Sequence, residues 1–427
     1  MPFDPFQFSR HDRLGVPVFV RQLPWVSGHA AIRVAFRVGA RLDPVGGEGF
    51  AHFFEHLPFD GCEGAVDHDA IETVRHTLFM GTLNAYTGME YTVFEGRART
   101  GRVGEALDFF RRLIWKPNLA DSEIERERQV ITREFWRRFE SPKDFELSRM
   151  RWADCFPAGH RFATHWNALG RPETIGAVNR DALLAFHRAR YVRENLAIFI
   201  AGDVDEATLG ATVEAFLADV PSGEAAPVAE NLAGPIAPPV ARRDLSYGEF
   251  YGVSGEALPK STTLDWSRVV PRSFAPERAL QLATGLLTRV LFDEIRGKFG
   301  ATYAVSPYLV TFSDLADVGF HTKIEPARAD EIAALAEETT RRVAAADPAF
   351  LAKFDEVKAG SLDHAEAAEF HSADIADDGA TDWAVYGAPQ LREPDIAAVR
   401  EATYASSADL VRRALSPGDC QRFILRP

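Results

Sequence analysis

Residues 50–61 read FAHFFEHLPFDG and contain the pattern HxxEH. If this segment is helical, His52 and His56 lie on one face about one turn apart, where two imidazoles can bind the same metal ion. Glu55 lies on the same side between them and can reach a water molecule on that metal without being a ligand itself. The segment therefore predicts a helix that supplies two metal ligands and a carboxylate base.

A metal site needs more than this pattern. In a chain with 12 histidines, HxxEH arises by chance in roughly two or three chains per hundred, and the alternative is a helix whose histidines are satisfied by neighbouring groups. A catalytic zinc site typically has three protein ligands and an open position for water. The segment 124–138, IERERQVITREFWRR, offers Glu127 and Glu134 on one helix face. One of them can be a ligand while the other supports the ligands from outside.

The charges of this second segment also allow a simpler interpretation, namely a solvated helix face. That interpretation suits Glu125, Arg126 and Arg128. It suits Glu134 less well, because apolar and aromatic residues surround it in the sequence. These neighbours are Val130, Ile131, Phe135 and Trp136.

Zinc is the metal that two histidines, one carboxylate and an open position favour.

The composition excludes several classes of function. Lys and Arg number 48 against 62 Asp and Glu, a net charge of -14, which is unsuited to binding nucleic acid. The longest apolar run, LAIFIA at 196–201, is far shorter than the ~20 residues that a membrane span needs, and the N-terminal residues do not resemble a signal peptide. Cys62, Cys155 and Cys420 form neither a disulfide framework nor a CxxC site. We therefore expect a cytoplasmic protein that binds no nucleic acid and no membrane.

The chain is expected to be α+β and duplicated. Residues 221–241, PSGEAAPVAENLAGPIAPPVA, lack apolar periodicity and are typical of a linker. A helix, a turn and a buried strand precede this linker (RDALLAFHRARY to NLAIFIAG), and the same order ends the chain (ADLVRRAL to QRFILR). We therefore expect a domain with the metal motif at 1–221, a linker at 222–241 and a homologous domain at 242–427. Each domain is expected to be a mostly antiparallel sheet packed with helices.

Over most of its length the sequence resembles the family of pitrilysin, insulin-degrading enzyme and mitochondrial processing peptidase. That family combines HxxEH with a later ExxxxxxE helix, at the distance that separates the two segments here. The resemblance implies that His52, His56 and Glu134 bind one Zn²⁺ per chain. It also implies that Glu55 is the general base and that Glu127 lies just outside the ligands.

Two further matches extend the resemblance. Asn84 and Ala85, in TLNAYTGMEYTVF, match an Asn-Ala pair with which the family holds the substrate backbone on an edge strand. Arg296 and Tyr303, in LFDEIRGKFGATYAV, match an Arg and a Tyr that stabilise the negative charge developing on the substrate carbonyl oxygen. Without the resemblance, we would interpret Arg296 as the partner of an acidic neighbour on the surface and Tyr303 as a half-buried strand residue.

The sequence departs from the family just after HxxEH. The family usually continues with Met or Leu and a Phe-Lys-Gly-like stretch, whereas LPFDGCEG follows here. Pro58 is expected to end or kink the helix soon after His56. Cys62, Glu63 and Gly64 replace the usual Lys-Arg signal. These changes concern the loop beyond the helix, so they affect substrate preference more than metal binding.

The resemblance implies one half of a clamshell and a zinc-dependent endopeptidase. Such an enzyme hydrolyses peptides, or leader and propeptide segments, that bind in extended form inside a dimer chamber. A chain of 427 residues corresponds to one half-shell, so we expect a homodimer or a heterodimer with a related chain, in which Arg296 and Tyr303 act on the partner's zinc site. The alternative is a non-catalytic partner subunit, but such relatives typically lose zinc ligands. An unrelated metal enzyme with HxxEH would not account for the Asn-Ala and Arg/Tyr matches.

Overall fold

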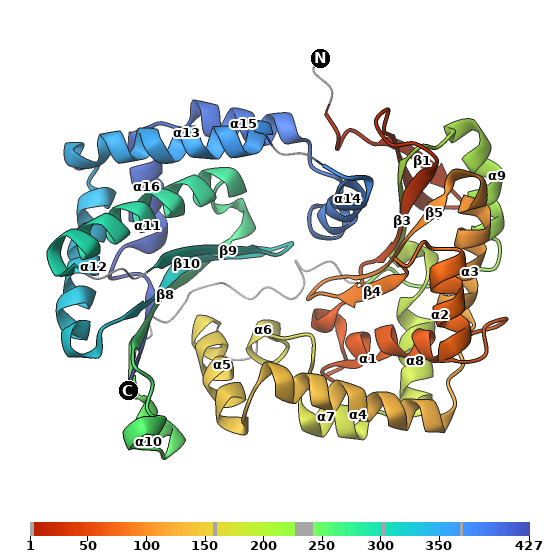
Figure 1. Cartoon of the computed structure of the whole chain (residues 1–427), viewed down its shortest axis with the longest axis horizontal. Helices are drawn as coiled ribbons and strands as arrows, with labels where there is room; N and C mark the ends of the chain where they lie inside the picture. The colour runs from red at the N-terminus through yellow and green to blue at the C-terminus, as the bar shows by residue number, and fades with distance from the viewer. Residues whose placement is uncertain (1–3, 157–159, 227–241, 301–303, 368–369) are drawn as a thin grey trace. The chain divides into compact units, whose positions relative to one another are not determined.

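The computed structural model describes residues 4–156, 160–226, 242–300, 304–367 and 370–427 (Figure 1). The chain divides into two compact units, and neither is continuous in sequence. Unit 1 comprises Met1–Glu140, His165–Val228 and Glu369–Arg392, and unit 2 comprises Ser141–Thr164, Ala229–Ala368 and Glu393–Pro427. Each unit contains a mixed sheet packed against helices, which confirms the expected α+β fold class.

The sheet of unit 1 has the strand order β1-β2-β6-β3-β5-β4. Its strands are β1 (Ser9–Arg13), β2 (Val16–Gln22), β3 (His29–Phe36), β4 (Asn84–Thr87), β5 (Thr92–Arg99) and β6 (Leu196–Gly202). β2 and β6 run parallel, and the other neighbouring pairs are antiparallel. The central strands β3 and β6 are buried along nearly their whole length because helices cover both faces of the sheet.

One face of this sheet carries the helices that surround the candidate site. The helices of unit 1 are α1 (Phe50–His56), α2 (His68–Thr77), α3 (Val103–Trp115), α4 (Asp121–Arg138), α7 (Pro172–Ala177), α8 (Arg180–Arg190), α9 (Glu206–Leu217) and α14 (Ser372–Tyr386). On the first face, Phe36 of β3 packs against Trp115 of α3 and against Tyr191 at the end of α8. α1 lies against β4 and β5. The strand alternation therefore places one set of apolar side chains under the helix that carries HxxEH.

The opposite face is covered by α14, which lies in the second half of the chain. Phe199 of β6 and neighbouring alanines of β3 pack with Ile375 and Ala380 of α14. A Cβ at Gly379 would lie 2.9 Å from the ring of Phe8 and 3.2 Å from that of Phe199. The small residues of α14 thus allow the helix to approach the sheet closely.

The two units exchange segments, which the sequence did not indicate. Residues 369–392 belong to unit 1 although they lie late in the chain, and residues 141–164 belong to unit 2. The contiguous ranges 1–221 and 242–427 therefore do not describe the packing units. Both exchanged segments are helical, and their packing partners lie far away in sequence, so no local pattern reveals them. Most of the expected linker, 222–241, lies outside the described residues.

Unit 2 has a sheet with the strand order β7-β11-β8-β10-β9. Its strands are β7 (Arg242–Ser246), β8 (Thr262–Pro271), β9 (Val305–Thr311), β10 (Leu315–Ile324) and β11 (Gln421–Arg426). Its helices are α5 (Pro142–Cys155), α6 (Arg161–Thr164), α10 (Tyr247–Tyr251), α11 (Glu277–Phe299), α12 (Ala329–Ala344), α13 (Leu351–Ala367), α15 (Arg392–Glu401) and α16 (Tyr404–Leu415). The core includes Trp266 and Phe320 of the sheet and Leu286 of α11.

The two sheets repeat one topology. In unit 1 the last strand, β6, lies between the parallel strand β2 and the antiparallel strand β3. In unit 2 the last strand, β11, lies between the parallel strand β7 and the antiparallel strand β8. β4 and β9 occupy the corresponding edges. The repeated order of helix, turn and final strand in the sequence therefore reflects two homologous domains, as expected.

α11, from Glu277 to Phe299, is the longest described helix. Across the described parts of the chain, no helix combines the length and the hydropathy that crossing a membrane requires.

Candidate metal centre

The helix that carries HxxEH is short, and a buried carboxylate holds its first turn. Asp43 is fully buried and accepts hydrogen bonds from the backbone nitrogens of Gly49 (2.7 Å) and Ala51 (2.8 Å). These nitrogens lie where a helix has no internal acceptors. Gly49 has a φ of 100°, and a Cβ at Gly170 would lie 2.1 Å from the carbonyl oxygen of Glu48. Glycine at both positions therefore fixes the path of the chain into α1.

α1 ends where the sequence predicts. Its last residue is His56, and a single 3-10 turn, η2 (Leu57–Asp60), follows with Pro58 in its first turn. Proline has no backbone N–H and cannot continue the hydrogen-bond ladder of an α-helix. The predicted helix end near Pro58 is confirmed, and His56 occupies the last turn of α1.

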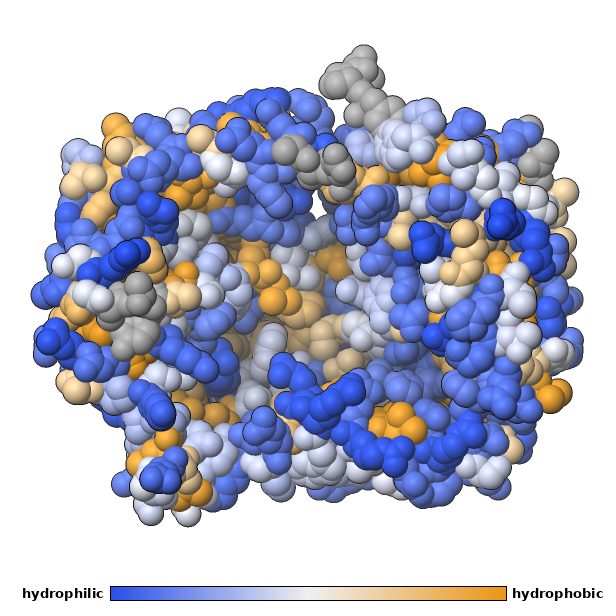
Figure 2. All heavy atoms as spheres, in the orientation of Figure 1, coloured by the Kyte–Doolittle hydropathy of each residue, from blue (hydrophilic) through white to orange (hydrophobic). Residues whose placement is uncertain are grey.

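α4 brings two carboxylates against α1. Its buried residues are Ile124, Glu127, Ile131 and Phe135. The side chain of Glu134 is 31% exposed. The outer face of α4 is charged, with Glu125 paired to Arg128 at 2.9 Å, and Figure 2 shows the hydrophilic surface over this helix at the lower edge of the view. A solvated face therefore accounts for Glu125 but not for Glu127.

Three ligand atoms converge between α1 and α4. The Nε2 atoms of His52 and His56 are 3.3 Å apart. Oε2 of Glu134 lies 3.8 Å from Nε2 of His52 and 3.6 Å from Nε2 of His56. In the described part of the chain, these residues form the one group of three His, Cys, Asp or Glu side chains close enough to hold a metal ion together.

The spacing of these atoms fits a tetrahedral metal site. Metal–ligand distances of about 2.0–2.2 Å imply that two ligands of a tetrahedral zinc ion are about 3.3–3.6 Å apart. The observed separations of 3.3 and 3.6 Å lie within this range, and the third, 3.8 Å, lies just above it. Two nitrogens and one carboxylate oxygen leave one tetrahedral position for water or substrate. The residues present therefore fit a catalytic zinc ion.

Glu127 orients one of the two histidines. Its Oε2 lies 3.1 Å from Nδ1 of His56. A carboxylate only accepts hydrogen bonds, so Nδ1 carries the proton and the lone pair of Nε2 faces the other two ligand atoms. Arg126 lies 3.8 Å from Glu127 and keeps this carboxylate beside a positive charge. Glu127 thus contacts the ring of His56 on the side away from the three converging atoms.

His52 differs from His56 in the hydrogen bonding of its Nδ1 atom. Nδ1 of His52 is buried, and among the described residues it has no hydrogen-bond partner. Burial and the nearby His56 lower the pKa of His52 to about 3, so its ring is neutral, as a metal ligand must be. For His56, burial favours the neutral form, but the hydrogen bond with Glu127 and the surrounding carboxylates outweigh it and raise the pKa.

Glu55 lies beside the converging atoms without joining them. It is 8% exposed. Burial raises the pKa of Glu55, and the charge of Glu134 adds to this effect, whereas His56 and a hydrogen bond with Thr87 act in the opposite direction. The net result is a raised pKa, which makes the carboxylate a stronger base.

The site opens into a cleft of about 710 Å³ whose lining includes Glu55, His56 and Asn84. Asn84 is exposed and begins β4, the strand at one edge of the described sheet. Ala85 is 7% exposed. The structure therefore places the Asn-Ala pair at a sheet edge beside the converging side chains, where an extended peptide can add as a further strand.

Of the predicted Arg/Tyr pair, the structure describes Arg296, which belongs to unit 2, whereas the three converging residues belong to unit 1. Arg296 is exposed in the last turn of α11 in unit 2, and its guanidinium lies 5.9 Å from the ring centre of Phe292. The acidic neighbours of Arg296 have other partners, since Asp293 pairs with Arg289 at 3.1 Å. Tyr303 lies outside the described residues.

Sequence reasoning missed several residues that shape the site. Asp43 caps α1 from a preceding loop, and Thr87 reaches Glu55 from β4. Glu95 of β5 accepts a hydrogen bond from Asn84 at 3.1 Å. The alternation of TVFEGRA could have placed Glu95 on one strand face, but only the register of the sheet sets it opposite Asn84.

The sequence matches two models of one peptidase family. The model described as insulinase (peptidase family M16) matches residues 26–156, and the model described as peptidase M16 inactive domain matches residues 177–360. The chain belongs to peptidase family M16, the insulinase family. This result confirms the resemblance found in the sequence. The first match contains the converging histidines and glutamates, and the second contains Arg296.

Individual relatives support the same family. An uncharacterised zinc protease from Rickettsia bellii is 28% identical over 335 residues, which cover 77% of this chain and 75% of that protein. The crystal structure of a peptidase M16 inactive domain from Pseudomonas fluorescens has a TM-score of 0.81 at 17% identity, over 99% of this chain and 98% of that chain. The periplasmic protease PqqL from Escherichia coli has a TM-score of 0.78 at 18% identity, over 99% of this chain but 48% of that chain. At these identities the two structures show a shared fold.

Proposed function

We propose that this chain is a zinc-dependent endopeptidase in which His52, His56 and Glu134 hold one Zn²⁺ and Glu55 is the general base. The observation that carries the proposal is the triangle of two imidazole nitrogens and one carboxylate oxygen, with edges of 3.3, 3.6 and 3.8 Å. A buried carboxylate beside this triangle completes the set of groups that hydrolysis of a peptide bond requires. Membership of a family with relatives named zinc proteases supports it.

The chain's own residues supply binding and proton transfer. An extended peptide adds to β4, where Asn84 holds its backbone. When bound, zinc acts as a Lewis acid that makes water a nucleophile at neutral pH. Glu55 accepts the proton from the attacking water and delivers it to the leaving amine. Glu127 keeps the ring of His56 in position throughout, because it binds Nδ1.

Metal content and cleavage test this proposal together. Protein purified without chelator is expected to contain about one zinc per chain and to cleave a quenched peptide. Removal of the metal with a chelator should abolish cleavage, and added Zn²⁺ should restore it. Protein that carries no zinc and cleaves no peptide after zinc is added would contradict the proposal and favour a non-catalytic partner subunit of the same fold.

We further propose that two chains act together, either two copies or this chain with a related one. The longer protease PqqL, which contains this fold in 48% of its length, supports the idea of a half-shell. In such an assembly Arg296 and Tyr303 of one chain would stabilise the negative charge at the partner's site. A cytoplasmic location is proposed as well, and the three buried free cysteines support it.

Complementation between inactive chains tests the shared site. A mixture of Glu55→Gln and Arg296→Ala chains is expected to regain activity, because one site of the mixed dimer then has both Glu55 and the partner's arginine. If Arg296 acted within its own chain, every chain of the mixture would lack one group and activity would stay low. Light scattering that shows a stable and fully active monomer would also contradict the proposal.

A further inference from the structure

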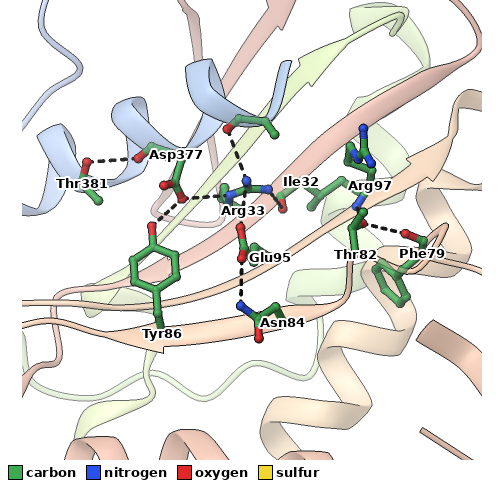
Figure 3. A network of polar contacts seen from close by, with 11 residues as sticks. Ile32, Arg33, Phe79, Thr82, Asn84, Tyr86, Glu95, Arg97, Asp377 and Thr381 are labelled. Atoms are coloured by element: carbon green, nitrogen blue, oxygen red, sulfur yellow. Dashed lines mark hydrogen bonds and ion pairs between the residues drawn. The ribbon is translucent and has the colours of Figure 1, made fainter. Parts of the chain in front are cut away.

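Arg33 is a charged residue buried in the sheet of unit 1. It lies on β3 and is 4% exposed. Its guanidinium pairs with Oε2 of Glu95 at 2.9 Å and with Oδ1 of Asp377 at 3.1 Å. It also donates a hydrogen bond to the carbonyl oxygen of Ala373 at 3.2 Å, and Figure 3 shows these contacts converging between β3, β5 and α14. A buried charge requires such partners, so the three side chains form one unit.

Each carboxylate of this unit also binds one residue of β4. The amide nitrogen of Asn84 donates to Oε1 of Glu95 at 3.1 Å, and the hydroxyl of Tyr86 donates to Oδ1 of Asp377. Asn84, Glu95 and Arg33 lie directly opposite one another on three adjacent strands. Alternate residues of a strand share a face, so both side chains of β4 are held from the face that α14 covers.

The contact with Glu95 fixes which way the amide of Asn84 points. A carboxylate only accepts hydrogen bonds, so the nitrogen of Asn84 must face it. Arg33 pairs with the other carboxylate oxygen of Glu95, and Figure 3 shows the carbonyl oxygen of Asn84 directed away from Glu95. Asn84 also lines the cleft that contains Glu55 and His56. The group that Asn84 can offer to an incoming peptide is therefore a hydrogen-bond acceptor.

We propose that Arg33, Glu95 and Asp377 are positioning residues for the substrate. They hold β4 in place and present the carbonyl oxygen of Asn84 to a backbone N–H of an extended peptide. This inference rests on the proposed peptidase function and adds to it a role for α14, which enters unit 1 from the second half of the sequence.

Glu95→Gln tests this positioning with little change in volume. A glutamine cannot accept hydrogen bonds from Asn84 and Arg33 with both of its terminal atoms, since one of them is an NH₂ group. We expect KM for a quenched extended peptide to rise about fivefold to tenfold, the effect of one oriented hydrogen bond. kcat and the zinc content should stay close to those of the wild type. Asp12→Asn on β1, at the other edge of the same sheet, is a matched control and should leave KM unchanged.

Peptides methylated at single backbone nitrogens give a readout that a merely structural role would not produce. In the wild type, methylation of the nitrogen whose N–H contacts Asn84 should raise KM. In Glu95→Gln the same methyl group should raise KM only slightly further, because the carbonyl oxygen of Asn84 is no longer held in position. The loss of this difference would measure the coupling between Glu95 and the substrate backbone.

Thermal unfolding shows whether Glu95→Gln folds. If it does not, Tyr86→Phe removes a single hydroxyl from the same network and should raise KM in the same direction. An unchanged KM in a folded variant, or a full methylation penalty in Glu95→Gln, overturns the inference while zinc binding and cleavage by the wild type stand. A wild type that neither binds zinc nor cleaves peptides overturns the proposed function, and this inference with it.

Discussion

Replacement of Glu55 by glutamine is expected to lower kcat by about 10²–10⁴-fold, the contribution of a well-placed general base. Glutamine keeps the size and polarity of the side chain but cannot take a proton from water. Burial and Glu134 raise the pKa of Glu55, although His56 and Thr87 partly oppose them. The carboxylate is therefore a stronger base than an ordinary surface glutamate, and its loss should affect the chemical step more than binding.

Steady-state kinetics and metal analysis together check this result. The zinc content of Glu55→Gln should equal that of the wild type, because Glu55 is not among the three converging ligand atoms. Glu125→Gln, on the exposed face of α4 where Glu125 pairs with Arg128, is a matched control and should be fully active. A Glu55→Gln variant that keeps more than about a tenth of the wild-type kcat would show that another group is the base.

Replacement of Glu134 by glutamine is expected to abolish stable zinc binding, and with it cleavage. The change removes the only charged ligand of the proposed set and leaves two neutral imidazoles. Glu127→Gln should have a smaller effect, a loss of about 10–100-fold in zinc affinity, because it acts through the ring of His56. Zinc affinity measured by competition with a chromogenic chelator separates these two outcomes.

The order of the two effects decides which glutamate is the ligand. The sequence alone left this question open, because both residues lie on one face of the same helix. In the structure Oε2 of Glu134 lies 3.6 Å from Nε2 of His56, whereas Glu127 contacts Nδ1 on the other side of the ring. A larger loss of zinc affinity in Glu127→Gln than in Glu134→Gln would reverse the assignment.

The part of the site that could be predicted is the part set by helix periodicity. His52, Glu55 and His56 lie within a single helical turn, so their relative positions follow from the sequence once the segment is helical. Pro58 likewise marks the end of α1 by its own chemistry. The spacing of Glu127 and Glu134 placed both on one face of α4, and the family resemblance paired that face with α1.

The rest depends on contacts between segments far apart in the chain. Asp377 reaches Arg33 because α14 packs on the sheet of unit 1, and nothing in the pattern of 372–386 identifies that sheet as its partner. The contact between Asn84 and Glu95 depends on the strand register, in which a shift of one residue would move Glu95 to the other face. The predicted role of Arg296 stays a proposal, because it concerns an assembly of chains.

A crystal structure with anomalous diffraction data collected on both sides of the zinc absorption edge tests whether His52, His56 and Glu134 hold one zinc ion. We expect one anomalous peak, about 2.0–2.2 Å from Nε2 of His52, from Nε2 of His56 and from a carboxylate oxygen of Glu134. A zinc-loaded crystal with no peak there, or with the carboxylate of Glu134 turned away from both rings, would contradict it.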